Sequence, residues 1–123
     1  MKFNEESIYA IAKKAKELGI ELFVLDDGWF GKRDDDTSSL GDWTPDLDKL
    51  PGGIEGIARS VTELGMQFGL WFEPEMVSPK SDLYEAHPDW ILGNDDRENC
   101  LGRHQYVLDF SKDEVVDYIG DRM

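Results

Sequence analysis

A helix exit that occurs twice constrains the fold of this chain more than any other feature. Glu17-Leu18-Gly19 and Glu63-Leu64-Gly65 each close a stretch with helical spacing of apolar residues, and each leads into an apolar run. Glycine is common just past a helix, and a near-continuous apolar run is typical of a buried parallel strand. A helix–strand unit used twice in succession predicts a parallel sheet with right-handed crossovers. We therefore expect an α/β fold.

The apolar spacing and the turn residues predict the order of the elements. Helices are expected over residues 5–18, 54–64 and 81–86, and from Ser111 onward. Strands are expected over residues 20–25, 66–72 and 106–108. Asn4 is the expected N-cap of the first helix, and Ser111 with Glu114 forms a capping box for the last. The chain thus supplies about three parallel strands with flanking helices, and residues 28–51 form a segment longer than an ordinary connector.

Each expected strand ends in carboxylates. The acids are Asp26 and Asp27, Glu73 and Glu75, and Asp109. Because active sites of (β/α)8 barrels and of doubly wound sheets lie at the carboxyl ends of strands, we expect these acids to converge on one face. Aromatic residues occur near them, namely Trp29, Phe30, Trp43 and Trp71. Acids beside aromatics suit a polar ligand that also has flat apolar faces, such as a sugar.

Each of these residues has a structural alternative. Asp26 and Asp27 could bind ligand hydroxyls or could cap a helix and lock a loop; two successive acids face one ligand only if the strand ends near Asp26. Each aromatic could stack on a sugar or pack in the core. Arg103 could form a forked pair with a ligand, hold an acid in place, or make a surface ion pair. His87 and His104 lack metal-ligand spacing, which favours structural roles.

Composition excludes several classes of function. The net charge is −14, with 27 acidic and 13 basic residues, which argues against a nucleic-acid surface. No apolar run approaches the length of a membrane span. The single cysteine, Cys100, cannot form an internal disulfide, and no cluster with metal-ligand spacing is present in the sequence. We expect no metal and no cofactor, and the absence of a signal-peptide core predicts a cytoplasmic protein.

Several motifs stand in order along the chain. They are Leu25-Asp26-Asp27-Gly28-Trp29-Phe30-Gly31, Gly41-Asp42-Trp43, Lys49-Leu50-Pro51-Gly52-Gly53, Gly69-Leu70-Trp71-Phe72-Glu73-Pro74-Glu75-Met76-Val77, His87-Pro88-Asp89-Trp90 and Leu108-Asp109-Phe110-Ser111. Together they resemble α-galactosidases of glycoside hydrolase family 36. The resemblance covers nearly the whole chain from about Phe3.

The resemblance implies a retaining hydrolase with a (β/α)8 catalytic barrel, acting on terminal α-linked galactose in oligosaccharides such as melibiose and raffinose. By motif, Asp26 and Asp27 would bind galactose hydroxyls, O4 and O6, and Trp71 would line the sugar pocket. Arg103 would belong to the family's Gly-Arg-Asn-Gln motif, which this chain departs from at His104. The resemblance also implies a homo-oligomeric parent protein.

The catalytic residues of that family are missing from this chain. The nucleophile is an aspartate in a Lys-Trp-Asp motif on a following strand, the acid/base is a later aspartate, and neither motif occurs before Met123. A barrel also needs eight strands and about 250 residues. We therefore expect residues 1–123 to be an incomplete fragment of a single catalytic barrel domain, carrying substrate-binding residues and inactive alone.

Two other interpretations remain open from the residues. One is a small doubly wound module that binds a ligand or Mg²⁺ through the strand-end acids without hydrolysing glycosides. The other is a truncated, non-functional product, whose unpaired strand edges would promote association. A Lys-Trp-Asp strand after Met123 would favour the enzyme.

Overall fold

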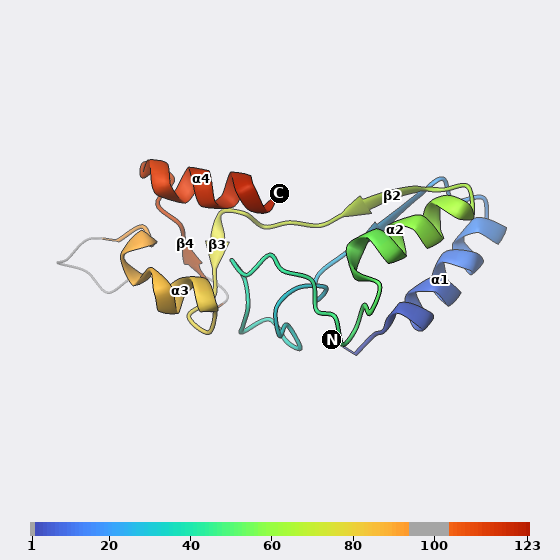
Figure 1. Ribbon diagram of the computed structural model, residues 1–123, viewed down its shortest axis with the longest axis horizontal. Helices are drawn as coiled ribbons and strands as arrows, with labels where there is room; N and C mark the ends of the chain where they lie inside the picture. Colours follow the sequence, from blue (N-terminus) through green and yellow to red (C-terminus); the bar gives the residue numbers. More distant parts are fainter. Residues whose placement is uncertain (1, 94–103) are drawn as a thin grey trace. The chain divides into compact units, whose positions relative to one another are not determined.

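The computed structural model describes residues 2–93 and 104–123, which fall into two compact units. The first unit contains Met1–Trp29 and Pro45–Phe72, and the second contains Phe30–Thr44 and Glu73–Met123. Figure 1 shows the elements of each unit. The chain passes from one unit to the other three times.

The first unit contains the predicted helix–strand repeat. Its elements are α1 (Glu5–Glu17), β1 (Leu22–Leu25), α2 (Gly53–Glu63) and β2 (Gln67–Leu70). β1 pairs with β2 in parallel, from Leu22 opposite Gln67 to Leu25 opposite Leu70. The prediction of parallel strands joined by a helical crossover is confirmed for this pair, although both strands are shorter than the apolar runs that contain them.

Local chemistry fixes the ends of the two long helices. The Asn4 side chain accepts a hydrogen bond from the Ser7 N–H at 2.8 Å, and the Ser7 hydroxyl accepts one from the Asn4 N–H at 3.0 Å. The predicted N-cap is therefore confirmed as a reciprocal capping box. Past the other ends, Gly19 and Gly65 have φ angles of +80° and +83°. Glycine adopts this left-handed conformation without steric cost, so the same turn leads into each strand.

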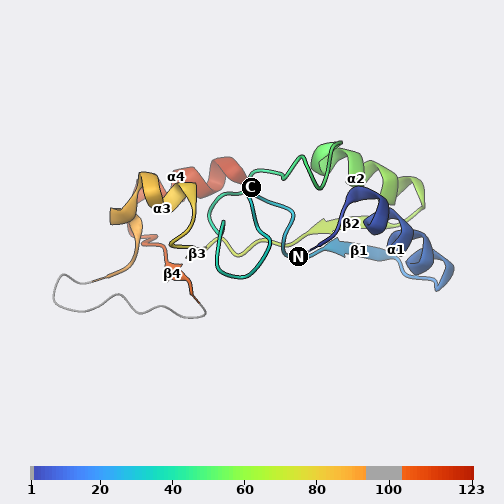
Figure 2. The same cartoon turned by 90° about the horizontal axis from the view of Figure 1, so that it is seen from below.

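The two helices cover one face of the two-stranded sheet. Ala12 of α1 and Val61 of α2 are fully buried with Met66, and Phe23 and Phe68 pack against them from the strands. Burial of a side chain the size of Val61 or Met66 contributes roughly 1.5–3 kcal/mol. Figure 2 shows α1 and α2 beside the strand pair. The first unit therefore has one helix-covered layer.

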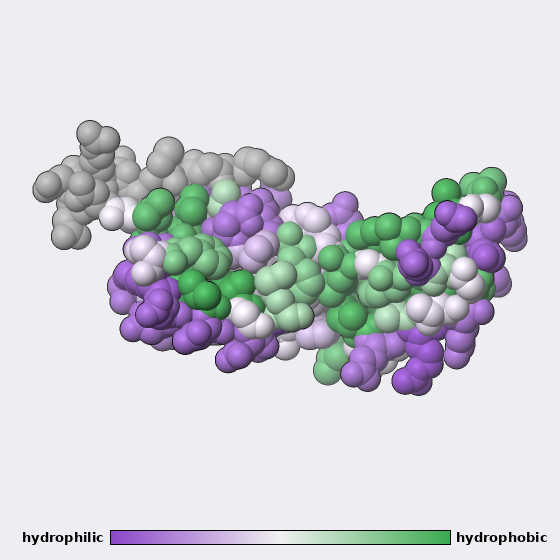
Figure 3. Space-filling model, turned by 90° about the horizontal axis from the view of Figure 1, so that it is seen from above, coloured by the Kyte–Doolittle hydropathy of each residue, from purple (hydrophilic) through white to green (hydrophobic). Residues whose placement is uncertain are grey.

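The other face of the sheet carries apolar side chains that nothing in the described residues covers. Leu22 and Val24 are 52% and 50% exposed, whereas Leu25 is buried. The alternation follows from the strand period of two, which sends successive side chains to opposite faces. Figure 3 shows hydrophobic residues gathered on the surface of this unit. β1 is therefore apolar on both faces but covered on one.

The second unit differs from the prediction. Its elements are β3 (Met76–Val77), α3 (Asp82–Ala86), a 3-10 turn η1 (Pro88–Trp90), β4 (Tyr106–Val107) and α4 (Asp113–Arg122). The predicted strand over residues 106–108 exists, but β4 pairs antiparallel with β3. Its expected place as a third parallel strand was therefore wrong. A strand this short does not determine whether it pairs parallel or antiparallel, because that depends on the partner strand. The partner here is β3, which was not among the predicted strands.

The expected cap of the last helix was also wrong. α4 has Lys112 as its N-cap, with no side-chain capping bond. The Ser111 hydroxyl instead donates to the Asp109 carboxylate at 2.6 Å, and the Ser111 N–H donates to it at 3.1 Å. Ser111 thus closes a turn that starts at Asp109, and it lies one residue before Lys112, the N-cap of α4.

The long segment over residues 30–44 is packed within the second unit. Arg33 and Leu40 are almost fully buried. The Arg33 guanidinium donates to the Ser38 carbonyl at 2.8 Å, and Leu40 exchanges hydrogen bonds with Ser78. The length of this segment therefore reflects packed structure and not a simple connector.

In the described part of the chain, no helix is long and apolar enough to cross a membrane.

Candidate functional site

The carboxyl ends of β1 and β2 lie side by side and carry three of the predicted site residues. The last pair in register is Leu25 opposite Leu70, and the Trp71 N–H donates to the Leu25 carbonyl at 2.9 Å. One step further along each strand are Asp26 and Trp71. The parallel pairing therefore brings an acid and an aromatic residue to the same edge of the sheet.

Asp26 and Asp27 both come after the last residue of β1. β1 ends at Leu25, so Asp26 and Asp27 no longer alternate across a pleated strand. The Asp26 carboxylate accepts a hydrogen bond from the Asp27 N–H at 2.8 Å, and Gly28 follows with a φ angle of +101°. Asp26 is exposed and Asp27 is half-buried. Two successive acids can face one ligand only if the strand ends near Asp26, and β1 does end there, at Leu25.

Trp71 is held through its backbone. Its N–H donates to Leu25 as described, and its carbonyl accepts from the Trp29 indole Nε1 at 3.0 Å. Trp71 is half-buried. A partly exposed aromatic residue on a fixed backbone is suited to contact the C–H face of a sugar, because an aromatic side chain has few rotatable bonds to order.

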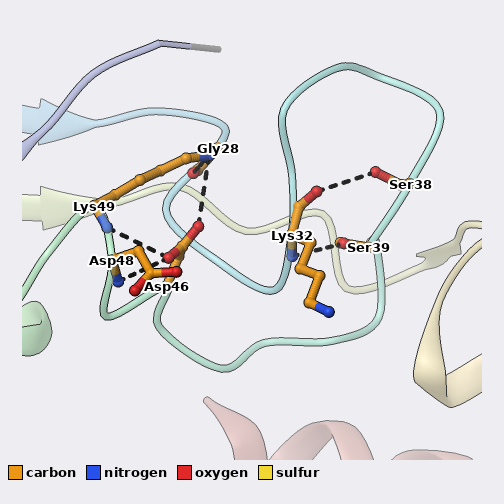
Figure 4. Close-up of polar contacts among 7 residues, drawn as sticks. All are labelled: Gly28, Lys32, Ser38, Ser39, Asp46, Asp48 and Lys49. Atoms are coloured by element: carbon orange, nitrogen blue, oxygen red, sulfur yellow. Dashed lines mark hydrogen bonds and ion pairs between the residues drawn. The ribbon is translucent and has the colours of Figure 1, made fainter.

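Lys49 supports the turn that follows the acids. Its ammonium donates to the Gly28 carbonyl at 3.1 Å and lies 3.8 Å from the Asp46 carboxylate. The same carboxylate accepts from the backbone N–H groups of Asp48 and Lys49 at 3.0 and 3.3 Å, as Figure 4 shows. The Lys49 side chain is only 11% exposed, so its charge is largely shielded from water. Residue-by-residue reasoning did not select Lys49; its only signal was a place in the Lys49–Gly53 motif.

Three of the four predicted aromatics are core residues. Trp29, Phe30 and Trp43 are 2%, 0% and 4% exposed. Trp29 meets Phe72 edge to face at 5.3 Å in the first unit, and Phe30 packs on Trp43 at 4.5 Å in the second. Buried rings of this kind cannot stack on a ligand without rearrangement of the core. The structural alternative therefore holds for these three, and Trp71 remains the candidate.

The remaining strand-end acids, Glu73, Glu75 and Asp109, belong to the second unit. Asp109 closes the turn described above, and the hydrogen bonds from Ser111 lower the pKa of its carboxyl. Its expected place on the shared face depended on a third parallel strand, which the antiparallel β3–β4 pair replaces. Glu73 and Glu75 follow β2 in the sequence, and their convergence with Asp26 and Asp27 stays a prediction.

The other predicted polar residues are placed as follows. Arg103 lies outside the described residues, as does Cys100. His87 stacks on Trp90 with ring centroids 3.8 Å apart, which is a structural contact. His104 is exposed, with a φ angle of +61°. Among residues 2–93 and 104–123, no group of three or more His, Cys, Asp or Glu side chains could hold a metal ion.

Asp42, a member of the Gly41–Trp43 motif, joins two segments of the second unit. Its two carboxylate oxygens accept hydrogen bonds from the N–H groups of Asp82 and Leu83, at 2.8 and 2.9 Å. It thus fastens the segment over residues 30–44 to the first turn of α3. Burial raises the pKa of the Asp42 carboxyl above its ordinary value, although these two bonds act in the opposite direction.

The fold and the site define an α/β protein with a polar site at the carboxyl edge of parallel strands, where (β/α)8 barrels and doubly wound sheets bind their ligands. The family model described as Melibiase matches residues 1–123. The chain belongs to this family.

Relatives and solved structures agree with this assignment. The α-galactosidase AgaA of Geobacillus stearothermophilus is 62% identical over 117 residues, which are 95% of this chain and 16% of AgaA. The α-galactosidase Mel36A of Lactobacillus acidophilus is 53% identical, over 98% of this chain and 16% of Mel36A. A solved variant of AgaA in complex with raffinose superposes with a TM-score of 0.93 at 60% identity, over 98% of this chain and 17% of that one.

These similarities confirm the resemblance to α-galactosidases of glycoside hydrolase family 36. The chain spans about one sixth of the length of the curated relatives that it matches. The α/β class is confirmed by the same structures and by the parallel β1–β2 pair.

Proposed function

We propose that this chain is a substrate-binding segment of a retaining α-galactosidase that removes terminal α-linked galactose from oligosaccharides of the melibiose and raffinose type. The observation that carries the proposal is the position of Asp26, Asp27 and Trp71 at one strand edge, in a chain that belongs to the Melibiase family. The raffinose complex of the AgaA variant supports the substrate class.

The chemistry of the three side chains suits galactose. A carboxylate accepts hydrogen bonds from two neighbouring hydroxyls at once, and each such charged bond contributes roughly 1.5–3 kcal/mol when it is shielded from water. Asp26 and Asp27 would accept hydrogen bonds from the O4 and O6 hydroxyls, while the Trp71 indole would cover an apolar face of the ring. Arg103 would add a forked donor to the same site.

We also propose that the first unit is part of a (β/α)8 barrel. Two parallel strands, each preceded by a helix on the same face, form the repeating unit of that fold. The uncovered face with Leu22 and Val24 would then point into the barrel, whose interior is filled by branched apolar side chains. Residues 1–123 would supply only part of that single domain.

The catalytic step would be carried by residues outside this chain. A retaining glycosidase uses two carboxyl groups about 5–5.5 Å apart, one as nucleophile and one as acid/base. Asp26 and Asp27 are assigned to binding, because the family motifs for both catalytic aspartates are absent from the sequence. The contribution of this chain is to hold the sugar in a fixed position relative to that pair.

The test compares the complete protein with the 123-residue chain. The complete protein should release galactose from raffinose and from an aryl α-galactoside, whereas the chain alone should release none. In the complete protein, Asp27→Ala should raise the inhibition constant of free galactose roughly 10- to 150-fold, which corresponds to one lost charged hydrogen bond. Glu63→Ala is the matched control, because that exposed acid ends α2 just before β2 begins, at the opposite end of that strand from Trp71. Turnover by the purified chain, or unchanged inhibition of the Asp27 variant, would refute the assignment.

A further inference from the structure

Trp29 occupies a position that core packing alone does not explain. It follows Asp27 by two residues, is 2% exposed, and donates its only side-chain polar hydrogen to the Trp71 carbonyl at 3.0 Å. The bond joins the turn after β1 to the residue after β2. It therefore crosses the strand edge at which the predicted sugar-binding residues lie.

The backbone of Trp71 is bonded on both sides to the segment that carries the acids. Its N–H donates to the carbonyl of Leu25, just before Asp26, and its carbonyl accepts from Trp29, just after Gly28. Asp26 and Asp27 lie between these two attachment points in the sequence. A shift of Leu25 or of the Trp29 indole would therefore move the Trp71 backbone or break one of the two bonds.

Trp29 is itself held in place. Its carbonyl accepts a hydrogen bond from the Asp46 N–H at 2.8 Å. The carbonyl of the preceding residue, Gly28, accepts from the Lys49 ammonium, as Figure 4 shows. Its ring is wedged edge to face against Phe72. Trp29 and the residue before it are thus held by three separate contacts. Small displacements of substrate-positioning residues can be costly for catalysis.

We propose that Trp29 is a positioning residue for the galactose site, acting through the Trp71 backbone to set the indole of Trp71 against the Asp26–Asp27 pair. The proposal rests on the α-galactosidase function proposed above. In this proposal Trp29 does not contact the sugar. Its indole N–H determines the position at which Trp71 contacts it. Lys49 contributes to the same arrangement by holding the Gly28 carbonyl.

The experiment is a double-mutant cycle in the complete protein. Trp29→Phe keeps a large buried ring and removes only the N–H, and it is made both in the wild-type background and with Trp71→Leu. Trp90→Phe, in the second unit, is the matched control for loss of an indole. The inhibition constant of free galactose, the KM and kcat for an aryl α-galactoside, and the urea midpoint of unfolding are measured for each protein.

A positioning role predicts a coupled effect. Trp29→Phe should raise the galactose inhibition constant and KM at least about fivefold, as expected for one lost hydrogen bond. With Trp71→Leu already present, the same substitution should change them by less than about twofold. Trp90→Phe should leave both constants unchanged.

Other outcomes overturn the proposal. Equal losses in both backgrounds would mean that Trp29 acts only through stability, and no loss at all would mean that the bond does not matter for binding. If Trp29→Phe does not fold, Lys49→Met tests the same turn by the same cycle. A complete wild-type protein that neither cleaves α-galactosides nor binds galactose would refute the proposed function and this inference together, whereas an active protein with an additive cycle would refute only the inference.

Discussion

Asp42 is a single residue that joins two segments of the second unit. Its carboxylate accepts two backbone N–H groups at the start of α3 while being about half-buried. Burial raises the pKa of this carboxyl more than the two backbone hydrogen bonds lower it; the nearby Asp82 charge raises it further, and Arg122 lowers it. The folded chain therefore holds the Asp42 proton more tightly than the unfolded chain does. The capping role is maintained in spite of this electrostatic cost.

A dependence of stability on pH follows. The Asp42 contribution to the free energy of unfolding is largest below the unfolded pKa, and it falls as the pH rises through the window up to the raised folded pKa. Asp42→Asn removes the charge, so the stability of this variant relative to wild type should increase with pH across that window. Urea unfolding of both proteins from about pH 3 to about pH 7 measures the difference.

Asp35 provides a control of opposite sign. Hydrogen bonds from Thr37 lower the pKa of its carboxyl. Its contribution is therefore present above the unfolded pKa and is lost as the pH falls. Asp35→Asn should lose stability relative to wild type as the pH rises. A constant difference between wild type and Asp42→Asn over the whole range would contradict the account of Asp42.

For single residues, the sequence indicated which ones are candidates for the site better than it indicated whether their side chains are buried. Asp26, Asp27 and Trp71 could be selected because they end apolar runs, and parallel pairing then brings Asp26 and Trp71 together. The burial of Trp29 could not be predicted, because an aromatic residue next to acids has the same local pattern whether its ring points inward or outward. Lys49 could not be selected either, because its partner is a backbone carbonyl distant in sequence.

Among the elements, α1 illustrates how much of a helix is locally encoded. Its start and its end were predictable, because the cap and the glycine act over a few residues. Its apolar stripe was predicted only in part, since Ile8 and Ala12 are buried whereas Ile11 and Leu18 are 61% and 73% exposed. The direction of β4 was not, because pairing depends on residues distant in sequence. The Ser111 error has the same origin on a smaller scale, since two turns compete for one serine hydroxyl.

The capping box of α1 should contribute measurably to stability. Asn4→Ala removes the acceptor for the Ser7 N–H, and it should lower the free energy of unfolding by about 1 kcal/mol. Lys13→Ala, at an exposed position within the same helix, should change it by less than about 0.5 kcal/mol. Urea unfolding followed by circular dichroism measures both. An Asn4 variant as stable as the Lys13 variant would show that the cap is energetically neutral.

For the molecule as a whole, the uncovered face of the β1–β2 sheet is the main unsatisfied surface in the described part of the first unit. Leu22 and Val24 would together gain stabilisation on the order of 25 cal/mol for each Å² that a neighbouring layer buried. An apolar sheet face of this kind either meets the rest of its own domain or associates with another molecule.

The substitution Val24→Lys should therefore have opposite effects in the two contexts. In the 123-residue chain it should reduce self-association, because a charge is placed on the exposed apolar face. In the complete protein it should lower the unfolding temperature, because the same face would lie inside the barrel and an unpaired charge there is costly. Thr62→Lys, at an exposed position on α2, should do neither. Light scattering and thermal unfolding give the two readings, and an unaffected complete protein would contradict the barrel proposal.

The three points at which the chain crosses from one unit to the other also have a consequence for the evolution of such a protein. The junctions fall after Trp29, after Thr44 and after Phe72, and two of them lie within a few residues of the strand-edge acids and Trp71. Segments that begin there can be lengthened or exchanged while the hydrogen bonds around Trp29 and Lys49 keep the strand-edge residues in place. Under the proposed function, recognition of the rest of an oligosaccharide would then diversify from one lineage to another around an unchanged site for its terminal sugar.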